Sequence, residues 1–233
     1  MGEFSDRLVA ELIDAVKAAL KKERAERLRD VYLIGDIDKD TARASIERIR
    51  ELANDGPGTI NLYLNTAGGN VTDGLALHDA IQQVVASGVE VAVVVQGMAY
   101  SMGSIVLQAA SPGKRLCFPH SWIMIHEPAK WAGWQSTTAA AQHLDRLKQM
   151  QSQIYRILSA RSGKQLRQII RDTKRTDFYL DATRALEYGL VDHVLGVTHA
   201  STPIPAEASQ PQPMDATGAE PRPSEAAAVA TNS

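Results

Sequence analysis

The fold is decided by residues 89–110, which read VEVAVVVQGMAYSMGSIVLQAA. The run from Val89 to Val95 is apolar on both faces, which is typical of a strand in the centre of a parallel sheet. A turn at residues 97–101 and a helix from Ser101 to about Ala110 follow it. A buried strand that passes directly into a helix predicts an α/β fold, in which functional side chains gather at the carboxyl ends of the strands.

Strand and helix patterns alternate on both sides of this stretch. Upstream, the sequence predicts strands at 31–34 and 60–64, a helix at 38–54 with Asp40 as its N-cap, and a second helix that Gly88 closes. Downstream, it predicts strands at 115–118 and 122–126, a long helix at 137–160, short helices, and a last strand at 190–195. Repeated β-α-β units with short loops indicate one α/β domain with right-handed crossovers, spanning residues 30–198.

The two ends of the chain differ from this body. Residues 1–29 contain apolar side chains at helical spacing, with both signs of charge on the polar face, which favours an amphipathic helix that packs on the body or on a neighbouring subunit. Residues 199–233 hold six of the ten prolines and no aromatic residue. Such a segment buries little apolar area, so we expect a disordered Pro/Ala-rich tail.

Composition excludes several classes of protein. The formal net charge is −2, from 25 basic and 27 acidic residues, which does not suggest a nucleic-acid surface. The single cysteine, Cys117, rules out a disulfide framework within one chain and favours a reducing compartment. The start of the chain lacks the pattern of a secretory signal, and the longest apolar run has only strand length. We therefore expect a cytoplasmic protein that binds neither nucleic acid nor membranes.

Two strand ends carry residues that suit acyl-transfer chemistry. The pair Gly68-Gly69 forms either a plain tight turn or a backbone cradle for an oxyanion, and no nucleotide-binding motif surrounds it. Ser101 stands at a helix start, where it is either an N-cap or a nucleophile with the Met102 N–H beside it. The spacing is not that of the Gly-x-Ser-x-Gly elbow, so an α/β-hydrolase loses support.

A third strand end carries His126, the side chain best able to accept a serine proton near neutral pH. A carboxylate must then orient the imidazole ring. In sequence order, Asp172 and Asp177 are the nearest candidates.

Together these segments resemble the proteolytic subunit of the Clp protease, the ClpP family, from about Val31 to Leu195. Residues 100–104, Tyr-Ser-Met-Gly-Ser, are similar to that family's Ala-Ser-Met-Gly nucleophile motif, and residues 124–128, Met-Ile-His-Glu-Pro, to its Met-Ile-His-Gln-Pro. Residues 65–71 are similar to its Asn-Ser-Pro-Gly-Gly loop. Residues 180–192 match the segment that follows its catalytic aspartate.

The resemblance implies a ClpP/crotonase-like fold of repeated β-α-β units with a protruding handle helix. It implies Ser101 as nucleophile, His126 as general base and then acid, and the N–H groups of Gly69 and Met102 as the oxyanion hole. The family reads Asp-Thr-x-Arg-Asp where this chain has one extra residue. Threonine offers no negative charge, so we assign the triad position to Asp177 and the insertion to Thr176.

The resemblance also implies a serine endopeptidase inside a self-compartmentalised homo-oligomer. It would be the proteolytic component of an ATP-dependent Clp-type protease, with peptides or unfolded proteins as substrates. No metal or organic cofactor is expected, because only a partner AAA+ unfoldase would consume ATP. The long helix supports assembly, since its narrow apolar stripe is expected to be buried against another surface. That surface belongs either to another subunit or to its own domain. That stripe comprises Leu144, Leu147, Met150, Ile154 and Ile157.

Two other functions remain open at this point. A catalytically silent ring subunit would keep the fold for assembly alone, and the shifted aspartate favours it. An acyl-CoA enzyme of the crotonase fold would share the two-amide oxyanion hole, but it would not need Ser101 together with His126.

Overall fold

We describe the fold from a computed structural model, which describes residues 9, 11–20, 29–128 and 136–196. Its single sheet follows the order β1 (Asp30–Ile34), β2 (Ile60–Thr66), β3 (Val91–Tyr100), β4 (Arg115–Cys117) and β7 (His193–Val194). These neighbours are all parallel. Strand β5 (Trp122–Ile125) also pairs in parallel with β3, and β6 (Phe178–Asp181) pairs antiparallel with β5.

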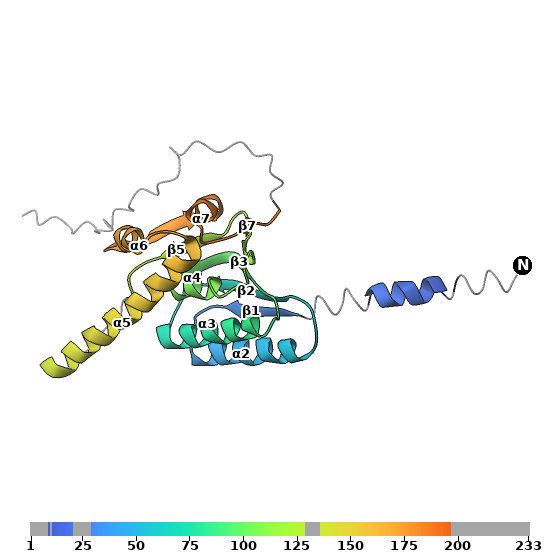
Figure 1. The fold of residues 1–233 in the computed structure, drawn as a ribbon, viewed down its shortest axis with the longest axis horizontal. Helices are drawn as coiled ribbons and strands as arrows, with labels where there is room; N and C mark the ends of the chain where they lie inside the picture. Colours follow the sequence, from blue (N-terminus) through green and yellow to red (C-terminus); the bar gives the residue numbers. More distant parts are fainter. Residues whose placement is uncertain (1–8, 10, 21–28, 129–135, 197–233) are drawn as a thin grey trace, which may run out of the picture. The chain divides into compact units, whose positions relative to one another are not determined.

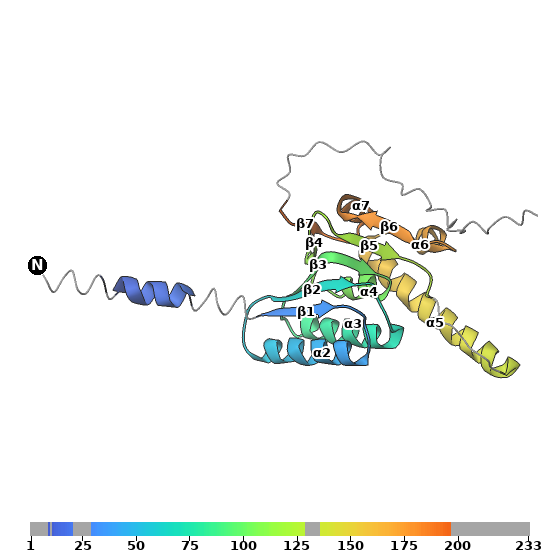
Figure 2. The ribbon, with the colours of Figure 1, turned by 180° about the vertical axis from the view of Figure 1, so that it is seen from behind.

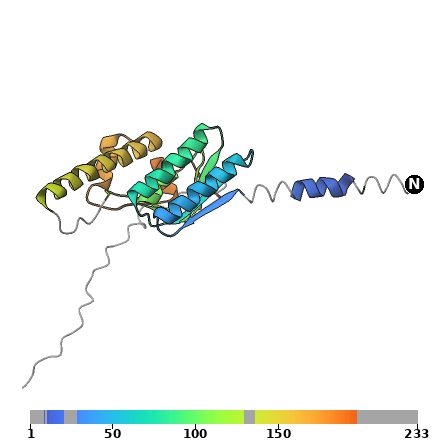
Figure 3. The same cartoon turned by 90° about the horizontal axis from the view of Figure 1, so that it is seen from below.

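Helices pack against one face of this sheet. Helices α2 (Lys39–Asn54) and α3 (Val71–Ala86) lie side by side, and α4 (Met102–Leu107) follows β3 directly. Seen from behind, β1 lies in front of α3 (Figure 2), and seen from below, α2 and α3 lie side by side in front of the sheet (Figure 3). Helices α6 (Leu166–Thr173) and α7 (Ala182–Tyr188) flank β6. The predicted α/β fold is confirmed.

Strand β3 positions the site because it is central and long. Residues 91–95 are all buried, as predicted for a strand covered on both faces. The predicted turn at 97–101 is wrong, since the strand continues to Tyr100. The reason is a second neighbour: β4 pairs with Val93 to Val95, whereas β5 pairs with Met98 to Tyr100 and supplies the hydrogen-bonding partners there.

Three other local predictions need correction. The N-cap of α2 is Asp38 and not Asp40, because the Asp38 carboxylate accepts the N–H groups of Asp40 and Thr41 at 3.0 and 2.8 Å. The helix after Ser101 ends at Leu107, and the last strand comprises only His193–Val194. Strand β6 was not predicted, since its four residues are held by a long-range pairing with β5.

Helix α5 (Thr137–Ser162) is confirmed and has two unlike halves. Toward its C-terminal end, Ile154, Tyr155 and Leu158 are buried in the core of the domain. Toward its N-terminal end, Leu144 is 49% exposed, and this half projects away from the sheet (Figure 1). The apolar stripe predicted along this helix therefore packs into its own domain at the C-terminal end and is exposed at the N-terminal end.

A buried polar cluster ties the elements around α5 together. The Arg115 guanidinium donates to the Asp192 carboxylate, to the Arg161 carbonyl at the end of α5, and to the Gly189 carbonyl after α7. It also donates to the Gln108 side chain behind α4 at 2.8 Å. This one side chain thus links α4, α5, α7 and the strand β4 that carries it.

Other predictions concern residues near the ends and the lone thiol. Residues 11–20 are helical, and the apolar side chains Leu12, Ile13, Val16 and Leu20 are exposed there. Of the predicted helix at 1–29, residues 1–8, 10 and 21–28 lie outside the described residues, as does the tail at 199–233. No helix within the described ranges is long and apolar enough to cross a membrane. Cys117 is fully buried.

Candidate active site

Ser101 occupies a strained corner between β3 and α4. Its backbone adopts φ 50° and ψ −118°, which a residue other than glycine rarely does. Its N–H donates to the Met124 carbonyl of β5 at 2.9 Å, so the corner is anchored to the neighbouring strand. The Ser101 side chain makes no capping hydrogen bond to α4, which leaves its Oγ free for another partner. Ser101 therefore occupies the N-cap position of α4, but its side chain does not cap the helix.

The Gly68-Gly69 loop lies against this corner so closely that side chains are excluded. A Cβ on Gly68 would lie 2.7 Å from the Ser101 Cβ, and one on Gly69 would lie 2.2 Å from the Ile37 carbonyl oxygen. Both glycines have positive φ, at 105° and 149°. Two hydrogen bonds of 2.7 Å, from Ile37 to the Gly68 carbonyl and from Asn70 to the Ile37 carbonyl, fix the loop.

Two backbone N–H groups next to Ser101 are unpaired within the described part of the chain. Met102 is the first residue of α4, so its N–H has no partner inside the helix. The Gly69 N–H lies between the two hydrogen bonds to Ile37 and takes part in neither. Both residues line one pocket with Ser101, which is the arrangement that an oxyanion hole requires.

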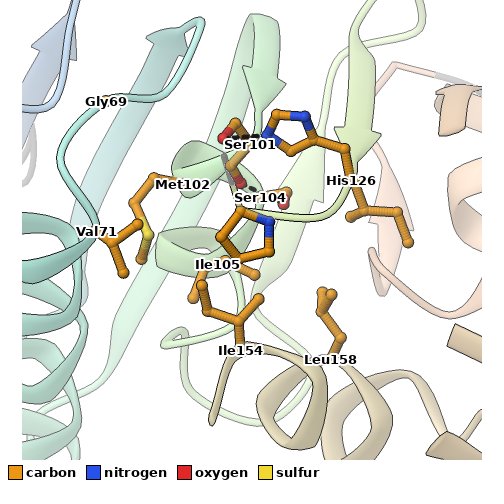
Figure 4. Close-up of a pocket in the computed structure, with 11 residues that line it drawn as sticks. Gly69, Val71, Ser101, Met102, Ser104, Ile105, His126, Ile154 and Leu158 are labelled. Carbon is orange, nitrogen blue, oxygen red and sulfur yellow. Dashed lines mark hydrogen bonds between the residues drawn. The ribbon is translucent and has the colours of Figure 1, made fainter. Parts of the chain in front are cut away.

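His126 and Asp177 complete a chain of polar contacts from Ser101. The His126 Nε2 lies 2.7 Å from the Ser101 Oγ, and its Nδ1 lies 3.2 Å from the Asp177 Oδ1 (Figure 4 shows the first contact). A carboxylate only accepts hydrogen bonds, so Nδ1 carries the proton and Nε2 is left to accept the serine hydroxyl. The three residues follow or precede the neighbouring strands β3, β5 and β6.

Asp172, the other predicted carboxylate, is engaged elsewhere. It accepts the Tyr188 hydroxyl at 2.9 Å and the Arg171 guanidinium at 3.2 Å. Burial is the main cause that raises the pKa of the Tyr188 hydroxyl, and the contact with Asp172 raises this pKa further. Asp172 therefore holds α6 to α7 and does not contact the imidazole of His126.

An apolar pocket opens beside the serine. The side chains that face it come from α3, α4, the buried half of α5, and the end of β5 with the residues that follow it (Figure 4). Its apolar side chains are those of Val71, Met102, Ile105, Ile125, Pro128, Ile154 and Leu158. The pocket is thus able to take an apolar side chain next to the Ser101 hydroxyl.

Sequence reasoning missed three residues of this region. Ser104 lies three residues after Ser101, and its hydroxyl donates to the Ser101 carbonyl at 2.6 Å. Ile154 was assigned only to the stripe of α5, and Leu158 was not singled out, although both line the pocket. The helical spacing of Ile154 and Leu158 places them on one face, which is the signal that the sequence contained.

The described residues contain no set of side chains that could bind a metal ion. No group of three or more His, Cys, Asp or Glu side chains with a metal-binding arrangement occurs among residues 29–128 and 136–196 or in the N-terminal helix. The absence of a cofactor requirement remains a prediction.

Comparisons with known proteins agree with this geometry. A model of the family described as Clp protease matches residues 14–198. The chain is 40% identical over 168 residues to ATP-dependent Clp protease proteolytic subunit 1 of Gloeobacter violaceus. These residues make up 72% of this chain and 83% of that protein. It is 38% identical over 169 residues to ATP-dependent Clp protease proteolytic subunit 2 of Cutibacterium acnes, which covers 72% of this chain and 77% of the other.

Proposed function

The chain belongs to the Clp protease family, and on that premise we propose that it is a serine endopeptidase whose nucleophile is Ser101. The observation that carries the proposal is the unbroken contact chain from the Ser101 Oγ through the His126 ring to the Asp177 carboxylate, at 2.7 and 3.2 Å. The unpaired N–H groups of Gly69 and Met102 beside it support the same chemistry.

The proposed reaction proceeds in two halves. In the first, the Ser101 Oγ attacks the peptide carbonyl while His126 Nε2 takes the hydroxyl proton, and the Gly69 and Met102 N–H groups bind the oxyanion. The imidazolium then gives its proton to the leaving amine, and an acyl-enzyme forms. In the second half, His126 activates a water molecule that hydrolyses the ester. Asp177 orients the ring and stabilises its charged form throughout.

The pocket beside Ser101 supports a preference for substrates with an apolar side chain next to the cleaved bond. Its apolar lining comes from helices α3, α4 and α5 and from strand β5 with the residues that follow it, so the preference is built into the core of the domain. Charged side chains would lose their hydration there without gaining a partner, because the aliphatic residues around the pocket offer none.

Assembly is the second part of the proposal. The relatives are named proteolytic subunits of ATP-dependent proteases, and family membership implies oligomeric assembly and protein substrates. We propose a homo-oligomeric double ring joined through α5, with an AAA+ unfoldase that consumes ATP and delivers unfolded chains. The exposed N-terminal half of α5 supports this role of the handle helix. The cytoplasmic location stays a prediction.

The two alternative functions are less well supported. A silent ring subunit would not need the contact between Ser101 and His126. An acyl-CoA enzyme of the crotonase type would not need a serine in a strained conformation at the end of a strand. The shifted aspartate, which favoured the silent subunit, lies within hydrogen-bond distance of His126.

A fluorophosphonate probe with mass mapping tests the proposal, because only an activated serine reacts. We expect the wild-type protein to be labelled at Ser101 and to hydrolyse short fluorogenic peptides. We expect neither labelling nor turnover in Ser101→Ala, and strongly reduced labelling in His126→Ala. Labelling at another serine in Ser101→Ala, with peptidase activity retained, would show that the site is wrongly assigned.

A further inference from the structure

We propose that Ser104 is a positioning residue for the reaction. Its hydroxyl holds the peptide group between Ser101 and Met102 in the orientation that presents the Met102 N–H to the oxyanion. The inference rests on the proposed function, since it concerns the oxyanion hole of that reaction.

The geometry depends on a shared peptide group. The Ser101 carbonyl oxygen accepts two hydrogen bonds from Ser104, one from the hydroxyl at 2.6 Å and one from the backbone N–H at 3.1 Å (Figure 4). The Ser101 C=O and the Met102 N–H belong to one planar trans peptide and point in opposite directions. Whatever fixes the carbonyl oxygen therefore fixes the direction of the N–H.

This peptide group needs such an anchor because the backbone at Ser101 is strained. With φ 50° and ψ −118°, Ser101 lies outside the regions that its Cβ favours. A change of ψ at Ser101, with a compensating change at Met102, would relax the strain and turn the N–H away from the pocket. Ser104 is completely buried, so its hydroxyl is shielded from water.

Ser104 is itself held from behind. The Ser104 carbonyl accepts a hydrogen bond from the Gln108 Nε2 at 3.2 Å. The Gln108 Oε1 in turn accepts one from the Arg115 guanidinium at 2.8 Å. Gln108 is fully buried. The anchor therefore connects to the buried cluster of Arg115 and Asp192, and is not a loose contact at the edge of α4.

Ser104→Ala tests the inference, with Ser45→Ala as a matched control. Ser45 is 4% exposed, and its hydroxyl also donates to a backbone carbonyl, that of Thr41 at 2.8 Å, but in α2. The readouts are kcat and KM for a fluorogenic peptide amide, and Ki for a peptide boronic acid. The boronate binds through a tetrahedral adduct that places an oxygen in the oxyanion hole.

Complete loss of an oxyanion donor lowers kcat about 10²- to 10³-fold, so loss of its anchor should cost roughly tenfold. We expect Ser104→Ala to lower kcat by about this factor, to change KM less than about twofold, and to raise the boronate Ki by the same factor as kcat falls. We expect Ser45→Ala to leave all three values within about twofold of the wild type.

The outcomes separate this inference from the proposed function. A wild type that neither reacts with the fluorophosphonate nor cleaves peptides overturns both. An active wild type with unchanged kcat and Ki in Ser104→Ala overturns the role of Ser104 alone, as does an equal loss of kcat in Ser45→Ala. If Ser104→Ala fails to assemble, Ser104→Cys, whose thiol donates weakly, takes its place with the same expected direction.

Discussion

At the scale of single residues, the site depends on where three neighbouring strands begin or end. Ser101 follows β3, His126 follows β5, and Asp177 precedes the antiparallel β6. Because these strands are lateral neighbours in one sheet, the three side chains meet without a long loop. Asp177 immediately precedes β6, a four-residue strand that pairs with β5.

The choice between the two aspartates gives the sharpest residue-scale prediction. Asp177→Asn removes the negative charge that orients His126, and we expect kcat to fall by about 10²- to 10⁴-fold. Asp172→Asn removes contacts to Tyr188 and Arg171 but none to the imidazole, so kcat should stay within about threefold. Steady-state kinetics on the two purified variants decide it, and the reverse ranking would move the triad to Asp172.

The sequence was sufficient for part of this site. Ser101 and His126 stand at the ends of apolar strands within motifs, which is why residue type and position identified both. Asp172 and Asp177 were separable only through the resemblance, because two carboxylates five residues apart suit the role equally. The role of Ser104 depends on a 2.6 Å contact in three dimensions, which no spacing rule implies.

At the scale of elements, α5 has two functions in one helix. Its buried half forms a wall of the pocket through Ile154 and Leu158, and its other half leaves Leu144 exposed, as the proposed contact between rings requires. The sequence predicted the helix and its stripe but not the division between the halves. That division depends on where the rest of the domain ends along the helix, which periodicity does not encode.

The exposed half of α5 should carry the contact between rings. We expect Leu144→Glu combined with Leu147→Glu to split the oligomer into smaller species, since charge on a buried apolar contact is unfavourable. Lys148→Glu, on an exposed position of the same helix, is the control and should leave the oligomer intact. Light scattering with size-exclusion chromatography measures the result. A monomeric wild type at micromolar concentration would contradict the compartment itself.

The Arg115–Asp192 cluster gives a pH-dependent prediction. Burial opposes ionisation of Asp192, but its hydrogen bonds with Arg115 outweigh burial and lower the pKa of Asp192 below its usual 3.8. A lowered pKa in the folded state stabilises the protein at pH values above the ordinary pKa of an aspartate. That stabilisation is lost as the pH falls through the folded-state pKa. Acid should therefore weaken the link between α4, α5 and α7.

Asp192→Asn tests this link. We expect the variant to be less stable by about 3 kcal/mol at pH 7, because it leaves the buried Arg115 without its carboxylate. The difference in melting temperature from the wild type should narrow as the pH falls from 3.8 through the lower folded-state pKa, because the wild-type carboxyl is then protonated as well. A difference that stays constant from pH 7 to pH 3 would contradict the role of this ion pair.

At the scale of the whole molecule, one domain carries both the site and the handle. The match to the Clp protease family spans residues 14–198 and ends where the proline-rich segment begins. The core and the site residues all lie within that span.

Deletion of residues 199–233 should leave the domain intact. We expect a melting temperature within about 2 °C of the full chain and peptidase activity within about twofold, because a proline-rich segment without aromatic residues adds little core. Deletion from Leu190 onward is the control, since it removes the buried Leu190 and Val191 together with Asp192, and should unfold the protein. A large loss of melting temperature in the shorter deletion would show that the tail docks on the domain.

The burial of the one cysteine makes this chain well suited to labelling at chosen positions. Cys117 is completely enclosed, and burial raises the pKa of its thiol to about 11, so the native thiol should resist alkylating reagents at neutral pH. A cysteine introduced at an exposed position, such as Leu144→Cys, would then be the only reactive thiol on the folded chain. A fluorophore attached there would report subunit association directly, without first removing the native cysteine.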